Sequence, residues 1–174
     1  MPSNLEYINS YSISGNVENF DISTFSSQYD IYEIHYTFNA TSSTGYIGCR
    51  LIDSSDAAIA TANEYWKASH AMRSYDTFFD NYSKTATSGA EIAYNQNYGA
   101  AGVLTIYNPF DSSKHTAWRN RTAGGTTATG QLFALHGITL HVNAEQINGV
   151  RFYAGGGGSN GFISGTARVY GVKE

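Results

Sequence analysis

The stretch Tyr29–Phe38, YDIYEIHYTF, decides the fold class. From Tyr32 onward, apolar side chains occupy every second position, and Glu33, His35 and Thr37 stand between them. A period of two is that of a β-strand with one buried and one solvated face. The polar stretch 39–45 that follows predicts a turn, and YIGCRLID at 46–53 predicts the partner strand of an antiparallel hairpin.

Similar but shorter patterns recur along the chain and predict further strands. These lie at 7–13, 91–97, 102–108, 114–121, 131–136, 138–143, 149–153 and 166–172. Nine or ten short strands at regular spacing favour an all-β, antiparallel jelly-roll sandwich. A chain of 174 residues is the size of one domain, so we expect residues 1–174 to form a single sandwich.

Two kinds of segment interrupt this pattern. The Ala-rich stretch 56–74 fits either a short helix or a strand at 64–68, because its apolar residues keep no clean helical period. The low-complexity pieces 123–130 and Gly155–Gly158 predict loops.

The composition excludes several classes of protein. Hydrophobic residues make up 41% of the chain, which is too many for a disordered one. No apolar run approaches the ~20 residues that span a bilayer, and MPSNLEYINS lacks the basic and apolar regions of a signal peptide. A net charge of −4 with scattered Lys and Arg argues against a nucleic-acid partner, and we expect no membrane partner either.

The sequence carries no catalytic or metal-binding motif, so we expect no enzyme, metal or cofactor. No serine stands in a G-x-S-x-G elbow, and the five histidines lack zinc-ligand spacing. Asp53–Asp56, DSSD, offers oxygen donors but lacks the later Gly and Glu of an EF-hand loop, so it favours a surface turn. Cys49 lies on an alternating apolar face and is interpreted as a buried residue.

The aromatic residues are the candidates for a contact surface. Fourteen tyrosines and two tryptophans exceed what the core of one small sandwich needs. Those in loop-like or ambiguous segments are candidates for an interface or a sugar-stacking surface, with ordinary packing as the alternative: Tyr65, Trp66, Tyr75, Tyr82, Tyr98 and Trp118. Trp118 with Arg119 and Arg121 is the best single patch by composition.

The segment 146–173, QINGVRFYAGGGGSNGFISGTARVYGVK, resembles the C-terminal signature of a family of tailed-phage virion domains found in tail fibres and capsid decoration proteins. The likeness rests on Ile147, Asn148, Gly149, Val150 and Phe152, and then on Gly161, Phe162, Gly165, Thr166, Val169, Tyr170, Gly171 and Val172. The segment 20–36 is similar to the opening of such domains, and the GGGGSN insertion is longer than their usual turn.

The resemblance implies a self-associating jelly roll, commonly a trimer, on the outside of a virion after synthesis in the host cytoplasm. It marks Gly149, Phe152, Phe162, Gly165, Tyr170 and Gly171 as structural residues, with close backbone approach at Gly165 and Gly171. The β pattern begins within about ten residues of Met1 and leaves no room for a fibre shaft. This favours a capsid decoration protein bound to the major capsid protein; the alternatives are a fibre tip that recognises host glycan and a carbohydrate-binding module.

Overall fold

The computed structural model describes residues 4–40, 45–74, 79–95, 99–126, 131–155 and 161–173, which form strands and connecting loops without a helix. The strands are β1 (Leu5–Val17), β2 (Asn19–Ile22), β3 (Ile31–Ala40), β4 (Gly45–Asp53), β5 (Tyr65–Arg73), β6 (Phe79–Ala86), β7 (Ala93–Asn95), β8 (Ala100–Tyr107), β9 (His115–Thr126), β10 (Gln131–Ala144), β11 (Ile147–Gly155) and β12 (Phe162–Val172). The expectation of an all-β antiparallel sandwich is therefore confirmed.

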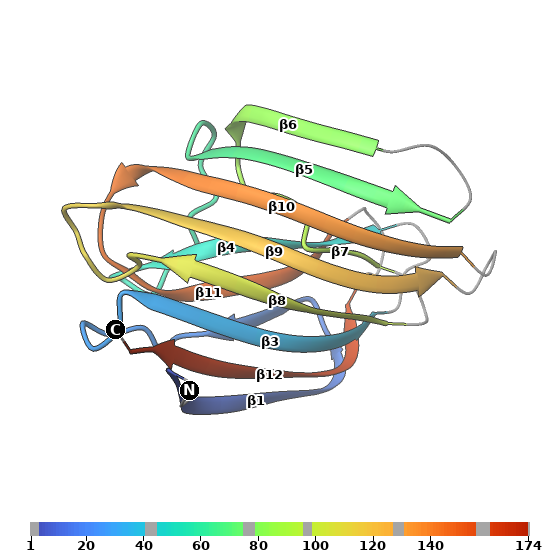
Figure 1. Ribbon diagram of the computed structural model, residues 1–174, viewed down its shortest axis with the longest axis horizontal. Coiled ribbons are helices and arrows are strands. Elements are labelled where there is room, and N and C mark those ends of the chain that lie inside the picture. The colour runs from blue at the N-terminus through green and yellow to red at the C-terminus, as the bar shows by residue number, and fades with distance from the viewer. Residues whose placement is uncertain are drawn as a thin grey trace.

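The strands form two sheets whose order contains a jelly roll. The larger sheet runs β1-β12-β3-β8-β9-β10-β5-β6 and the smaller one β2-β11-β4-β7 (Figure 1). The first four strands of the larger sheet and the four of the smaller sheet form the eight-stranded, double-sheet jelly roll. Two insertions, β5-β6 after β4 and β9-β10 after β8, add their strands to one edge of the larger sheet.

The core lies between the two sheets, where the alternation of β3 places it. Tyr32, Ile34, Tyr36 and Phe38 are buried there, as their spacing predicts. Phe38 packs against Phe152 of β11 and Phe162 of β12, with ring centroids 5.1 and 5.2 Å apart. Cys49 is buried in the same cluster, and burial raises the pKa of its thiol.

The signature residues of the C-terminal segment hold the last strands in place. β12 lies between β1 and β3, so the end of the chain is paired on both sides. A Cβ at Gly165 would meet Phe38 and the carbonyl of Thr37, and one at Gly171 would meet the ring of Tyr29. Close approach therefore requires glycine at both positions, as expected.

The hairpin predicted from 29–53 is wrong. β3 pairs with β12 and β8 in the larger sheet, whereas β4 pairs with β11 and β7 in the smaller one. Alternation gives the buried face of each strand but not its neighbour, and two strands facing one core from opposite sheets have the same pattern as a hairpin.

The remaining differences concern strand number and length. The described residues form twelve strands: β2 and β6 were not predicted, β5 comes from the ambiguous 56–74 stretch, and β7 is shorter than the strand predicted at 91–97. The 56–74 stretch holds no helix, and its strand is β5. β10 passes through Gly137 as one strand, and β9 continues to Thr126, into the predicted loop 123–130. Residues 127–130 and Gly156–Gly158 lie outside the described residues.

Candidate functional site

The outer face of the larger sheet carries the candidate site. Cross-strand register aligns side chains into rows over β8, β9, β10, β5 and β6. One row contains Tyr107, Ala117, Leu140 and Trp66; the next contains Thr105, Arg119, Ile138, Ala68 and Tyr82; a third contains Val103, Arg121, His136, His70 and Asp80. Three segments of the chain, distant in sequence, thus form one surface.

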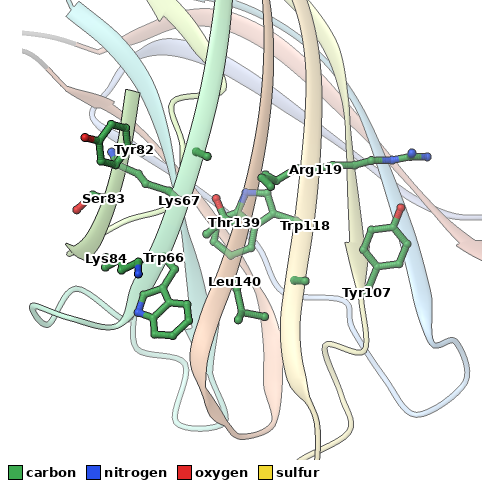
Figure 2. A pocket seen from close by; sticks show the side chains of 13 residues that line it. Trp66, Lys67, Tyr82, Ser83, Lys84, Tyr107, Trp118, Arg119, Thr139 and Leu140 are labelled. Atoms are coloured by element: carbon green, nitrogen blue, oxygen red, sulfur yellow. The ribbon is translucent and has the colours of Figure 1, made fainter. Parts of the chain in front are cut away.

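An apolar groove crosses the first two rows. Its volume is about 600 Å³, and Figure 2 shows the Trp66 indole at one end and the Tyr107 ring at the other. Trp66 is 49% exposed, Ile138 63% and Tyr82 82%. Lys84 lies 5.7 Å from the centroid of the Trp66 ring. Large apolar side chains this exposed and this close together are typical of a binding surface.

Two smaller hollows continue the groove along the same face. One, of about 470 Å³, shares Ala68, Tyr82, Arg119 and Ile138 with the groove and extends to His70, Asp80 and His136. The other, of about 200 Å³, lies between Arg119, Arg121 and the β3 residues Glu33 and His35. Arg119 lines all three, so the groove and both hollows are neighbours on one face.

Among the described residues of this face, the acidic side chains have ion-pair partners and the two arginines of β9 do not. His70 Nδ1 lies 2.6 Å from Asp80 Oδ1, and His35 Nε2 lies 3.1 Å from Glu33 Oε2. Both carboxylates are therefore engaged by a histidine. Arg119 and Arg121 form no ion pair with any residue that the structure describes.

The opposite side of this part of the sheet is covered by the segment 87–92, which is hydrogen-bonded to both sheets. The backbone N–H of Ala90 donates to Thr139 Oγ1 at 2.9 Å, and Gly89 lies against the Trp118 ring. The backbone N–H groups of Gly89 and Ile92 donate to β4 carbonyls, which joins the segment to the smaller sheet.

A mostly buried ion pair fastens the outermost strands to that segment. Lys67 Nζ of β5 lies 3.0 Å from Glu91 Oε1, and both side chains are largely buried. Asn81 Nδ2 of β6 donates to the same carboxylate at 3.0 and 3.1 Å. The strands that carry Trp66 and Tyr82 are therefore held by more than their ladder hydrogen bonds.

The residues proposed from sequence divide between the surface and the interior. Trp66, Trp118, Tyr82 and Arg119 line the groove, and Arg121 lines the hollows beside it. Tyr65 and Trp118, which were expected at the surface, are buried. They alternate with Trp66 and Arg119 along β5 and β9, so they point to the other side of the sheet. Tyr75 and Tyr98 lie outside the described residues.

Tyr65 is a structural residue with a fully used hydroxyl. Its oxygen accepts from Leu51 N at 3.0 Å and donates to Ile59 O at 2.9 Å. Burial raises the pKa of this hydroxyl, so it stays protonated as the donor that Ile59 needs.

The sequence interpretation missed Tyr107, Ile138 and Leu140. In β10 the apolar residues Ile138 and Leu140 face outward, while Thr139 and His141 are buried. The inner side of this strand meets the backbone of the segment 87–92, which needs polar partners such as Thr139 Oγ1. In the sequence, the alternation of Ile138 and Leu140 with Thr139 and His141 shows that the two apolar residues share a face, but it does not show that this face points to solvent.

The other candidate motifs have structural roles. Asp53 Oδ1 accepts hydrogen bonds from the N–H and hydroxyl of Ser55 and from the N–H of Ala57, which closes the DSSD turn and lowers the pKa of the carboxyl. Among the residues described, no three His, Cys, Asp or Glu side chains gather as metal ligands do. The described part of the chain contains no helix that is long and apolar enough to span a membrane.

Comparisons of this chain with protein-family models, with curated proteins and with solved structures found no match.

Proposed function

We propose that this chain is a non-enzymatic surface protein of a tailed-phage virion and that its outer-sheet groove binds a glycan of the host surface. The resemblance of its two ends to virion domains supports the first part. The groove supports the second, and it is the reason for preferring recognition of a glycan over decoration of the capsid as the leading function.

The half-exposed indole of Trp66 in an uncovered apolar groove is the observation that carries this proposal. A sugar ring has apolar C–H faces, and C–H groups pack against the electron-rich face of an aromatic ring. The volume of about 600 Å³ falls in the range of small-ligand sites. The lining side chains stand on strands, so binding requires little ordering of the protein.

Replacing Trp66 with alanine is expected to weaken glycan binding at least about tenfold, which corresponds to ~1.4 kcal/mol. The free energy of unfolding should fall by about 1–1.5 kcal/mol, because about half of the side chain is buried, and the variant should stay folded. A glycan array identifies the ligand, isothermal titration calorimetry measures its affinity, and adhesion to host cells gives the biological readout.

Tyr7→Ala is the matched control for this substitution. Tyr7 is 56% exposed on β1, at the far edge of the same sheet, and does not line the groove. The Tyr7→Ala variant should bind glycan with the affinity of the unmodified protein. Equal losses in both variants, or no glycan binding by the unmodified protein, would refute the glycan part of the proposal.

Capsid decoration is the second candidate function, and a different observation favours it. Met72 and Leu132 are 44% and 65% exposed on β5 and β10, outside the groove. An apolar surface that extends beyond a ligand-sized groove suits contact with the major capsid protein or with other copies of the chain, including the proposed homotrimer.

The copy number of the chain in purified particles decides between these locations. Quantitative mass spectrometry against the major capsid protein should give a few to a few dozen copies for a tail or fibre protein. Hundreds of copies would instead establish a decoration protein. Absence from the particle would exclude both and leave a cellular carbohydrate-binding module, and native mass spectrometry of the isolated chain tests the trimer.

A further inference from the structure

We infer that the glycan is acidic, and that Arg119 and Arg121 bind its carboxylate or sulfate group next to the apolar groove. This inference rests on the proposed function, because it names the ligand class of the same site. The supporting observations are the two arginines of the outer face, unpaired among the described residues, and the position of Arg119, which lines the groove and both hollows.

The two arginines are available for a ligand. They lie two residues apart on β9, so both side chains leave the same face about 6.6 Å apart along the strand. Neither has an acidic partner among the described residues, although the chain has a net charge of −4. In an acidic protein, two adjacent unpaired arginines form a local positive site.

The carboxylates that line the hollows with these arginines each lie beside a histidine, and neither forms an ion pair with Arg119 or Arg121. Glu33 shares the smaller hollow with both arginines, but its Oε2 lies 3.1 Å from His35 Nε2. Asp80, at the other end of the row, is engaged by His70. The ring of His35 is in turn held against Tyr170, with centroids 5.0 Å apart, so the pairing with Glu33 is fixed in place.

The positive site and the aromatic site lie within reach of one short ligand. Trp66 stands in the row of Ala117, two strands from β9, and Arg119 is one row further along β9. With ~4.8 Å between strands and ~3.3 Å per residue, the Cα atoms of Trp66 and Arg119 are about 12 Å apart. Figure 2 shows the Arg119 side chain crossing β8 away from Trp66, on the side of Tyr107. A ligand touching both ends is thus longer than a single sugar ring.

The chemistry of this end selects an oxyanion. A guanidinium group presents a planar set of donors that matches carboxylate and sulfate oxygens with two parallel hydrogen bonds. Ile138 and Leu140 offer no donor from their side chains, and the indole of Trp66 offers a single N–H. Lys84 adds a single ammonium group at the Trp66 end, whereas the two arginines supply paired planar donors, so we assign the oxyanion to the arginine end and the sugar ring faces to the groove.

Titration calorimetry with three oligosaccharides of equal length tests the inference: a tetragalacturonate, a sulfated galactan tetrasaccharide and a neutral galactotetraose. The acidic probes should bind at least about tenfold more tightly than the neutral one, and added salt should reduce this difference. The stronger of the two acidic probes identifies the group as carboxylate or sulfate.

The double variant Arg119→Gln/Arg121→Gln should lose that tenfold preference and keep its affinity for the neutral probe within about twofold. Glu33→Gln should strengthen binding of the acidic probes, because it removes the one carboxylate from the hollow. Arg151→Gln is the control for loss of an arginine charge away from the groove, with one positive charge removed where the double variant removes two; Arg151 pairs with Asp21 on the smaller sheet, at 2.6 and 2.7 Å.

The outcomes separate this inference from the proposed function. Trp66-dependent binding of all three probes with equal affinity would overturn the acidic-ligand inference and leave the glycan proposal standing. Binding of no probe, with an empty glycan array, would overturn both. An equal loss of acidic-ligand affinity in the Arg151 variant would show a general charge effect and overturn the assignment to Arg119 and Arg121.

Discussion

Replacing Trp118 with alanine is expected to lower the free energy of unfolding by about 3–5 kcal/mol, the range for removing a large buried aromatic side chain. Trp118 is 2% exposed and packs edge-on against Tyr65, with ring centroids 5.7 Å apart. Gly89 of the covering segment lies so close to the indole that no Cβ fits between them. Gly89 has no side chain that could fill the cavity left by the substitution.

The stability of the Trp118→Ala variant is to be compared with that of Trp66→Ala. The two tryptophans occupy opposite faces of one sheet, so Trp118→Ala should cause the larger loss of stability and Trp66→Ala should reduce binding. Urea denaturation followed by circular dichroism measures both variants. A loss below about 1 kcal/mol in the Trp118 variant would contradict the buried position and the packing of the segment 87–92 beneath the groove.

Alanine at Gly149 is expected to cost about 3 kcal/mol, at the upper end of the range for overpacking, because the clash is with backbone. A Cβ there would clash with the Ile22 carbonyl oxygen and lie 2.9 Å from Ser23 Cα. The position follows a register shift between β11 and β4, where the backbone of β2 approaches from the other side. Relief would require β2 to separate from β11 and expose Ile22, which is fully buried.

Gly155→Ala on the same strand is the matched control. Its Cβ would meet the ring of Tyr46, a partly buried side chain that can rotate away. We expect a cost of about 1 kcal/mol or less there. Thermal unfolding by calorimetry compares the two variants, and equal effects would show that the loss of glycine, and not contact with β2, determines the cost at Gly149.

The two stability predictions test different parts of the molecule: the packing beneath the groove and the jelly roll. The groove is built on β5, β6, β9 and β10, which lie outside the eight-stranded jelly roll and are covered on their inner side by a segment without regular structure. Trp118 and the Lys67–Glu91 pair join these strands to that segment, together with the hydrogen bonds of Thr139 and Asn81. Substitutions at the signature glycines should instead destabilise the jelly roll itself.

The sequence by itself determined the fold class and much of the core. The alternation of β3 identifies Tyr32, Ile34, Tyr36 and Phe38 as inward-facing, because a strand with one buried face must repeat every two residues. Local pattern also places Cys49 in the interior and the DSSD motif in a turn. Each of these properties depends on residues close together in the chain.

Only the tertiary structure decided which strands are neighbours and which side chains share a face. Trp66, Ile138 and Arg119 come from three segments, and only the register of β5, β10 and β9 brings them together. Thr139 is buried while Ile138 is exposed, because the inner neighbour of β10 at this point is the polar backbone of the segment 87–92 and not an apolar sheet. Pairing partners and the chemistry of the opposing layer are long-range properties, and neither is encoded in the hydrophobic period of a single strand.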